Sequence, residues 1–302
     1  MITRGIFQGC FPGDWPMARC VALAGELAFD GFEVVMEDDA PLLPEALDET
    51  TEDVLAIGRS VGVTALREGA LTLGASPEAL ADLTTLAREA GVRVHSVATM
   101  LLFYYPLSSP VRVVREKGIQ VVLEMLRAAA GIGAETALIQ AGMVTPGVGY
   151  LEAYERSRSV IRDLATEAER VGVVLAIENV WSRFLLSPLE FARYLDEIGS
   201  SYVGAYVDVA NVLTFGYPDD WLRILGPRVR GVHFKDFRRE IDNILGFTHL
   251  LHGDVPWNAV MAALHDIQYD GAVTVEAPPL RTCPEEGLRQ ARAALELILG
   301  AC

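Results

Sequence analysis

Four ionisable residues end four successive apolar runs in the second half of the chain. Glu178 ends VVLAIE, Asp208 ends YVGAYVD, His233 lies near the end of RVRGVHF, and Glu276 ends AVTVE. Such β-branched runs are typical of buried strands, so each ionisable side chain is expected where a strand ends. A single acid at such a place is most often a helix cap or an ion-pair partner. Four in succession indicate a shared site, and we call them the ligand quartet.

Alternation along these runs predicts that the ligand quartet points in one direction. Side chains two positions apart share a face of a strand, and the residues two before the quartet are often small, as Ala176 and Gly231 are. We therefore expect the four ionisable side chains to face inward, toward one another. The positions between them are apolar, as contact with a layer of helices requires: Ile177, Val207, Val232, Phe234 and Val275.

Three carboxylates and one imidazole form an oxygen-rich set of ligands. Such a set suits Mn²⁺ or Mg²⁺ better than a structural zinc ion, which prefers thiolates and more histidines. Without a cation, three buried carboxylates would repel one another, and at least one would take up a proton. We therefore predict one divalent ion bound by Glu178, Asp208, His233 and Glu276.

Glu178 and Glu276 are expected to flank a molecule bound over this ion, because the runs that carry Asp208 and His233 separate them. A ketose that chelates the ion would become acidic at the carbon beside its carbonyl, since the ion stabilises an enediolate. One glutamate would remove that proton and the other would return one to the opposite face. This chemistry is that of an epimerase, although a 1,2-isomerisation could use the same groups.

Eight apolar runs alternate with segments of helical periodicity, which predicts the α/β class and a single (β/α)₈ TIM barrel over residues 1–302. A doubly wound open sheet is the alternative, but no G-x-G-x-x-G follows the first run. The expected strands are 4–9, 31–36, 92–97, 136–140, 173–178, 202–208, 228–234 and 272–276. The expected helices are 76–90, 111–131, 151–171, 187–198, 256–267 and 284–299.

Two serine–proline pairs mark expected helix starts. Ser76 and Ser187 each precede a proline and are predicted to be N-caps, and Glu190 would complete a capping box with Ser187. The second unit is irregular, because residues 37–75 contain more chain than one crossover needs. Only the last four strands are expected to supply ligands, since the first four show no comparable series of ionisable ends.

The composition excludes several kinds of partner. With 25 basic and 41 acidic residues the net charge is −16, so nucleic acid and anionic membrane surfaces would be repelled. No segment reaches the ~20 apolar residues that span a bilayer, and the first residues lack the apolar core of a signal peptide. We expect a cytoplasmic protein, because its cysteines match no zinc or redox pattern and are expected to be free thiols: Cys10, Cys20, Cys283 and Cys302.

The sequence also resembles the sugar phosphate isomerase/epimerase superfamily, which consists of xylose isomerase-like TIM barrels. The resemblance is most specific in LAIENVWSRFLLSP, VGAYVDVANVL, VHFKD, LLHGDVPWNAVMAAL and YDGAVTVEA, and the chain is most similar to the ketose 3-epimerases. It implies that the ligand quartet holds one Mn²⁺-type ion, with Mg²⁺, Co²⁺ or Zn²⁺ as alternatives. It also implies that Glu178 and Glu276 are the catalytic acid–base pair.

The resemblance implies substrate-binding residues as well. Asn211 matches a family position that faces the substrate. Arg239, with Arg238 as the alternative, matches an arginine that holds a substrate oxygen. Lys235 lies two positions after His233, so its side chain should face the same opening and either orient the substrate or pair with a carboxylate. The expected partner is a small sugar or sugar phosphate. Homo-oligomers are common among such barrels, and we expect one here.

Other functions on the same fold are weighed against this one. A lyase or dehydratase acting on an inositol-like or dehydroshikimate-like substrate could use the same ligand quartet. An apurinic endonuclease needs a histidine-rich zinc cluster and a basic face, which five histidines and a charge of −16 do not supply. A barrel that only binds sugar would gain little from two basic glutamates at an ion. The predicted function is therefore a metal-dependent sugar or sugar-phosphate epimerase or isomerase.

Overall fold

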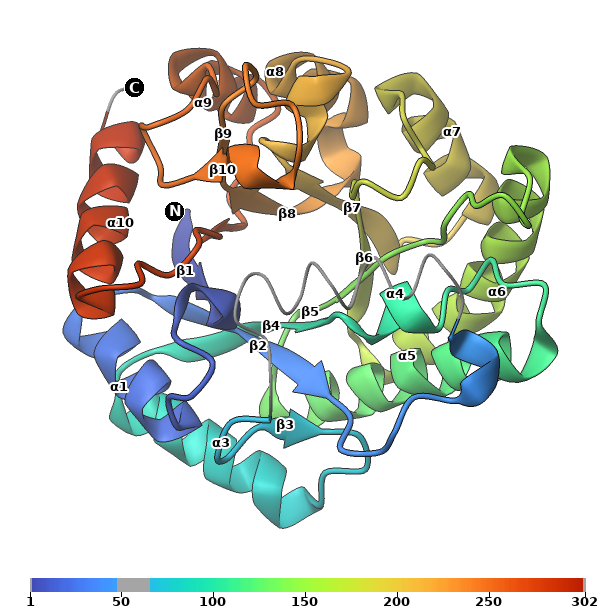
Figure 1. Cartoon of the computed structure of the whole chain (residues 1–302), viewed down its shortest axis with the longest axis horizontal. Helices are drawn as coiled ribbons and strands as arrows, with labels where there is room; N and C mark the ends of the chain where they lie inside the picture. Colours follow the sequence, from blue (N-terminus) through green and yellow to red (C-terminus); the bar gives the residue numbers. More distant parts are fainter. Residues whose placement is uncertain (1, 48–65, 301–302) are drawn as a thin grey trace.

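A closed parallel barrel forms the centre of the molecule (Figure 1). The computed structural model describes residues 2–47 and 66–300, and within them eight parallel strands close on themselves, because β1 pairs with both β2 and β11. This closure confirms the predicted barrel and excludes the open sheet. In chain order the barrel strands are β1 (Thr3–Phe7), β2 (Gly31–Glu37), β4 (Arg93–Thr99), β5 (Thr136–Ile139), β6 (Val174–Glu178), β7 (Val203–Asp208), β8 (Val229–Phe234) and β11 (Ala272–Val275).

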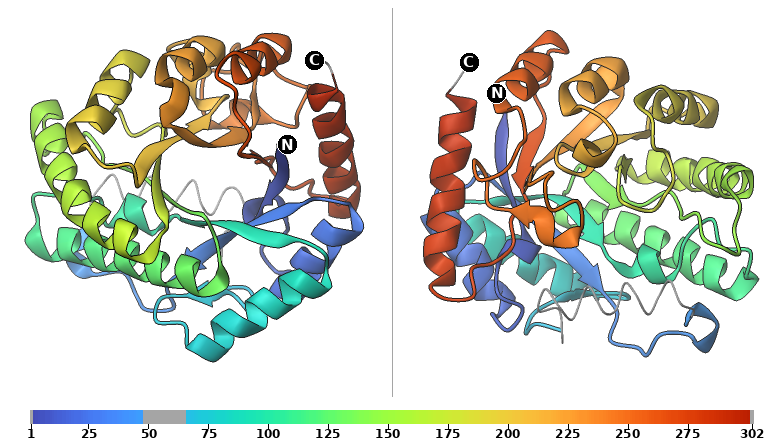
Figure 2. Two further views of the ribbon diagram at one scale, coloured as in Figure 1. Left: turned by 180° about the vertical axis from the view of Figure 1, so that it is seen from behind. Right: turned by 45° about the horizontal axis from the view of Figure 1, so that its top comes forward.

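Helices surround the barrel, as the two further views show (Figure 2). Strand residues that face them, such as Ile177 and Val207, are fully buried in the main hydrophobic core. Among the described residues, no helix is both long enough and apolar enough to cross a membrane. The helices are α1 (Met17–Glu26), α3 (Pro77–Glu89), α4 (Leu101–Tyr104), α5 (Arg112–Ile132), α6 (Tyr150–Val171), α7 (Pro188–Ile198), α8 (Pro218–Leu225), α9 (Trp257–Asp266) and α10 (Pro284–Leu299).

A separate small cluster fills the inside of the barrel. It consists of Ala98, Leu138, Ala176 and Tyr206, which come from four neighbouring strands and are all nearly or fully buried. Because side chains alternate along a strand, residues two positions further on also face the barrel axis. The inward direction predicted for Glu178 and Asp208 agrees with this cluster, since they continue the faces of Ala176 and Tyr206.

The predicted strands and helices are confirmed, with ends that differ by at most two residues. Ser76 caps α3, where its hydroxyl accepts a hydrogen bond from the backbone N–H of Ala79 at 3.2 Å. The predicted capping box at Ser187 is wrong, because this side chain makes no cap hydrogen bond. Glu190 accepts a hydrogen bond from the hydroxyl of Tyr150 at 2.6 Å instead, which ties the start of α7 to the start of α6.

Two segments lie outside the regular alternation. The irregular second unit contains the short strand β3 (Leu71–Thr72), which lies parallel to the end of β2 and pairs with Met36 and Glu37. Residues 48–65 of this unit are not among those that the structure describes. After β8, the strands β9 (Asp236–Phe237) and β10 (Phe247–Thr248) form an antiparallel pair.

Of the predicted free thiols, Cys10, Cys20 and Cys283 are free, and Cys302 lies outside the described residues.

Gly231 leaves the space that the ring of Tyr206 occupies inside the barrel, since a Cβ at position 231 would lie 2.4 Å from that ring. We predict that Gly231→Ala lowers the free energy of unfolding by roughly 1–3 kcal/mol, as overpacking of a core does. Urea unfolding measures the change. Gly147→Ala is the control, because its nearest neighbour would be 4.0 Å away. Equal stability of the two variants would contradict this packing.

Candidate metal centre

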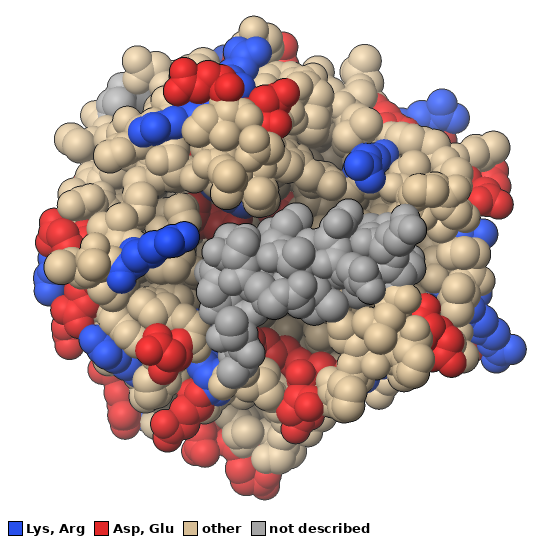
Figure 3. Space-filling view, viewed as in Figure 1, with Lys and Arg blue, Asp and Glu red and all other residues tan. Residues whose placement is uncertain are grey.

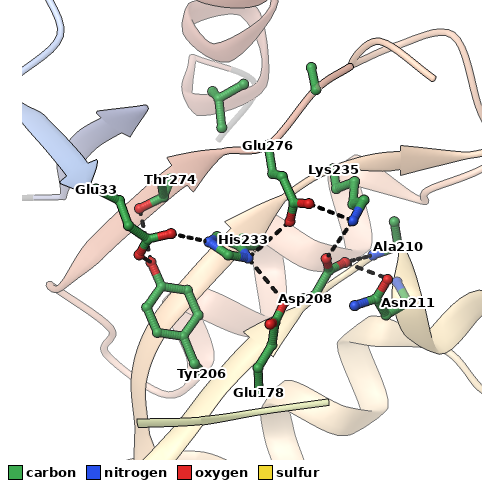
Figure 4. Close-up of polar contacts among 12 residues, drawn as sticks. Glu33, Glu178, Tyr206, Asp208, Ala210, Asn211, His233, Lys235, Thr274 and Glu276 are labelled. Carbon is green, nitrogen blue, oxygen red and sulfur yellow. Dashed lines mark hydrogen bonds and ion pairs between the residues drawn. The ribbon is translucent and has the colours of Figure 1, made fainter. Parts of the chain in front are cut away.

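The predicted ligand quartet converges at the carboxyl ends of β6, β7, β8 and β11 (Figure 4). One donor atom of each of Glu178, Asp208, His233 and Glu276 lies within 4.8 Å of the others. The His233 ring lies between the two glutamates, with its Nδ1 atom 3.1 Å from Oε1 of Glu178 and 3.1 Å from Oε2 of Glu276. The quartet residues predicted from sequence are therefore brought together.

Backbone hydrogen bonds fix the Asp208 carboxylate in one orientation. Its Oδ1 accepts the N–H groups of Ala210 and Asn211 at 2.8 and 2.9 Å. Asn179 holds the backbone of Asp208 on both sides, since its side chain accepts from the Asp208 N–H at 2.8 Å and donates to the Asp208 carbonyl at 2.9 Å. Asp208 Oδ2 is buried and accepts no hydrogen bond from the described residues.

This orphaned oxygen indicates that the site fits a cation. A buried carboxylate oxygen without a donor is unfavourable, and a divalent ion bound by it and by the rest of the ligand quartet would compensate for the missing hydrogen bond. The donor set is rich in oxygen and includes a single nitrogen, which fits an ion of the Mn²⁺ or Mg²⁺ kind. The structure thus supports a metal site at this position, and the identity of the ion stays a prediction.

Burial and mutual repulsion shift the pKa values of the carboxyl groups. Burial, together with the charges of Glu276 and Asp208, raises the pKa of Glu178 to about 7 against the opposing effect of His233. Burial also raises the pKa of Asp208. Burial alone would raise the pKa of Glu276, but Lys235 and His233 outweigh it, so this pKa lies below its ordinary value. The two glutamates therefore differ in their tendency to hold a proton.

Lys235 directly follows β8, and its side chain contacts two carboxylates of the ligand quartet. Its Nζ atom donates to Oε1 of Glu276 at 2.7 Å and lies 3.6 Å from Oδ2 of Asp208. Burial alone would lower the pKa of Lys235, but these two carboxylates outweigh burial and raise it. Lys235 thus pairs with carboxylates of the quartet, and its ammonium group reduces the repulsion between them, while a role toward the substrate stays a prediction.

Glu33 on β2 is a buried partner of His233 that the sequence analysis missed. Its Oε1 lies 2.7 Å from Nε2 of His233, and its Oε2 accepts the hydroxyl of Tyr206 at 2.8 Å. Because Glu33 engages Nε2, the Nδ1 atom of His233 is left to face the quartet, as is common for histidines that bind metals. The four candidate ligands all come from the last four strands, as expected, but β2 contributes a residue that supports one of them.

A polar chain continues from Glu33 into the barrel. The Tyr206 hydroxyl lies 3.0 Å from Oγ1 of Thr274, which in turn lies 2.9 Å from Nε2 of His95. Burial alone would raise the pKa of Glu33, but the charge of His233 outweighs it and lowers the pKa. Burial alone would lower the pKa of His233, but Glu33 and the two glutamates of the quartet outweigh it and raise the pKa.

The other predicted substrate-binding residues lie at different distances from the quartet. Asn211 is buried at its edge, where its amide donates to the Asn179 carbonyl at 3.0 Å and its own carbonyl accepts from Nε1 of Trp181 at 2.9 Å. Arg239 is exposed, and its guanidinium lies 5.8 Å from the ring centre of Tyr217. The structure therefore brings Lys235 and Asn211 to the quartet but leaves the Arg239 side chain outside it.

On the face viewed in Figure 1, the basic side chains that can be seen do not form one broad patch. Figure 3 shows acidic side chains recessed near the centre of this face, with Lys and Arg side chains apart from one another around it. Nucleic-acid binding would require clustered basic residues. The visible face thus agrees with the expected small-molecule partner.

Comparisons with known proteins agree with the fold. The family model for the xylose isomerase-like TIM barrel matches residues 21–298. A D-psicose 3-epimerase of Enterocloster bolteae is 31% identical over 128 residues, which are 40% of this chain and 40% of the length of that relative. A crystal structure of a D-psicose 3-epimerase in the presence of D-fructose has a TM-score of 0.72 at 19% identity, and covers 99% of this chain and 100% of its own.

A second solved structure is similar to the same extent. The D-psicose 3-epimerase with D-tagatose from Clostridium cellulolyticum H10 has a TM-score of 0.73 at 16% identity, and covers 99% of both chains. Because the sequence identity to both structures is below 25%, their similarity establishes the fold alone.

Removal of the Glu33 carboxylate tests its support of His233. We predict that Glu33→Ala weakens Mn²⁺ binding by about 10–100-fold, as the loss of a partner behind a ligating histidine does. Tyr206→Phe should cost less, because it leaves the contact between Glu33 and His233 in place. Titration calorimetry on the folded variants measures both affinities. An unchanged affinity in Glu33→Ala would show that His233 does not depend on this partner.

Proton competition provides a second test of the site. Glu178, with a pKa of about 7, and His233, with a raised pKa, hold protons near neutral pH. A metal ion competes with protons for the ligating atoms of both residues, so binding must release protons and weaken as the pH falls. We predict that the Mn²⁺ dissociation constant rises roughly tenfold or more between about pH 7.5 and about pH 6. Calorimetry in buffers of different ionisation enthalpy counts the protons, and a constant affinity over this range would refute the assignment.

Proposed function

We propose that this chain, which belongs to the xylose isomerase-like TIM barrel family, is a metal-dependent ketose 3-epimerase. The observation that carries the proposal is the position of Glu178 and Glu276, each 3.1 Å from the same Nδ1 atom of His233. Two carboxyl groups on either side of one metal site can act on opposite faces of a bound ketose. The names of the similar proteins, D-psicose 3-epimerases, support the same reaction class.

The ligand quartet would hold the ion, for which we propose Mn²⁺. When bound, such an ion polarises the carbonyl of the ketose and stabilises the enediolate that forms when the neighbouring carbon loses its proton. The residues of the chain do the rest. Asp208, with its Oδ1 fixed by backbone N–H groups, presents Oδ2, and Glu33 keeps the His233 ring in place.

The two glutamates would divide the proton transfers between them. Glu276 has a lowered pKa and is ionised, which suits removal of the proton at C3. Glu178, on the other side of the site, would return a proton to the opposite face from the carboxyl oxygen that does not hold the ion. Microscopic reversibility exchanges the two roles when the reaction runs backward, so one pair serves both epimers.

Three further residues are proposed to act on the substrate. Lys235 and Asn211 lie beside the quartet, where they could hold substrate oxygens. Arg239 can contribute only if its guanidinium leaves the ring of Tyr217. The substrate is a small ketose or ketose phosphate.

The assembly and location of the protein are also proposals. We propose that residues 1–302 act as one barrel domain in the cytoplasm, which the free thiols of Cys10, Cys20 and Cys283 support. We further propose a homo-oligomer, supported by large apolar side chains that are exposed on the surface, such as Leu189 at 69% and Leu245 at 74%.

Loss of either glutamate should abolish turnover. We predict that Glu178→Gln and Glu276→Gln each lower the epimerisation rate by about 10²–10⁴-fold, because an amide cannot transfer the proton. The measurement uses a panel of ketoses and ketose phosphates with Mn²⁺, and product analysis. Glu169→Gln, an exposed site on α6, is the control and should keep full activity.

The same assay in deuterated water identifies the reaction. Proton transfer through the glutamates predicts deuterium at the inverted carbon, whereas a hydride shift leaves none there. Full activity in both glutamine variants would contradict the proposal. A product that has lost water would instead assign the protein to the dehydratases of the superfamily.

A further inference from the structure

Gln140 is a buried residue beside the metal centre whose side chain is only half satisfied. It directly follows β5 and is 3% exposed. Its Nε2 group donates to the carbonyl of Thr99 at 3.3 Å. Its Oε1 atom is buried and accepts no hydrogen bond from the described residues.

Strand register places this side chain next to Glu178. Leu138 on β5 pairs with Ala176 on β6, and both side chains belong to the cluster inside the barrel. Two residues further along each strand come Gln140 and Glu178, which therefore face the barrel axis at the same height. Neighbouring strands lie about 4.8 Å apart, so the two side chains are adjacent.

The amide of Gln140 has a defined orientation. Thr99 offers a carbonyl, which can only accept, so the nitrogen of the amide must face Thr99 on β4. The oxygen is then turned away from this neighbour. It is the atom of Gln140 that has no partner among the described residues, and it can only accept a hydrogen bond.

A second buried glutamine shows what the chain does where a glutamine is structural. Gln8 is 2% exposed, and its Oε1 accepts the backbone N–H of Val35 at 2.8 Å. Buried acceptors in proteins are satisfied with few exceptions, because an unpaired one is destabilising. Gln140 is such an exception. Asp208 Oδ2 likewise accepts no hydrogen bond from the described residues, although the Nζ atom of Lys235 lies 3.6 Å from it.

We propose that Oε1 of Gln140 accepts a hydrogen bond from a hydroxyl group of the ketose bound at the ligand quartet. This inference rests on the proposed function and adds a specificity-determining residue to it. A ketose with a hydroxyl at that position satisfies the buried acceptor, whereas a deoxy analogue leaves it unpaired and binds less well. Gln140 makes no contact with the proton that is transferred, so it affects binding and leaves the chemical step unchanged.

Gln140→Met tests the proposal, because methionine has a similar length and volume but lacks the acceptor. The dissociation constant of the preferred ketose for the Mn²⁺-loaded protein, and its KM, should rise about tenfold, with kcat changed less than about twofold. The urea midpoint should fall less than in Gln8→Met, because Gln140→Met loses the hydrogen bond to Thr99 but also removes an unsatisfied buried acceptor. Gln8→Met is the matched control, and its urea midpoint should fall.

Deoxy analogues of the preferred ketose test the same contact without any variant. One analogue should bind the wild-type protein about tenfold more weakly than the parent ketose, and Gln140→Met should bind both equally. Equal binding of every analogue to the wild type would overturn the inference. So would unchanged ketose affinity in Gln140→Met, since the oxygen would then be satisfied by water or within the protein. If the wild-type protein binds and converts no ketose, the proposed function itself has failed.

Discussion

Repulsion between like charges is the constraint on which this structure depends. Three carboxylates with donor atoms within 4.8 Å of one another are placed at one end of a barrel where water has little access. Groups of this kind favour separation or protonation. The chain holds them together through strand register, through the clamp of Asn179 on Asp208, and through the ammonium group of Lys235. The result is a set of donors that is arranged before any ligand arrives, which is what rapid and selective binding of a divalent ion requires.

The interior of the barrel below the quartet contains polar side chains that hold one of the ligands, His233, in place. Barrel cores are usually filled with branched apolar side chains, but here Glu33, Tyr206, Thr274 and His95 form a connected polar chain. Gly231 provides the room for the ring of Tyr206. A histidine that is bound from behind keeps one ring nitrogen directed at the metal site, so the packing of the core and the orientation of a ligand are part of one arrangement.

The sequence predicts some parts of this arrangement because they follow from local periodicity. Glu178, Asp208, His233 and Glu276 each stand at the end of an apolar run, and alternation along a strand is enough to infer their direction. Glu33 was missed because it stands inside its run and because the register of β2 against β4 shifts between Phe32 and Glu33. Such a bulge changes the direction of the side chains that follow. An acid inside an apolar strand was the signal that could have revealed it.

Other outcomes depend on contacts between distant segments, which periodicity does not encode. Glu190 was expected to cap its own helix, but its carboxylate accepts a hydrogen bond from Tyr150 of the preceding helix instead. Gln140 was recognised only as the end of a strand, and its place beside Glu178 follows from the pairing of β5 with β6. Arg239 fits a spacing, yet its guanidinium lies over Tyr217. Local patterns therefore located the metal site, whereas its supporting and substrate-facing residues required the fold.

The most direct test of this account is anomalous X-ray diffraction from crystals of the protein grown with Mn²⁺. The account predicts a single strong anomalous peak in contact with Glu178, Asp208 Oδ2, His233 Nδ1 and Glu276. A peak elsewhere, or an ion that leaves two or more of these side chains uncoordinated, would contradict it.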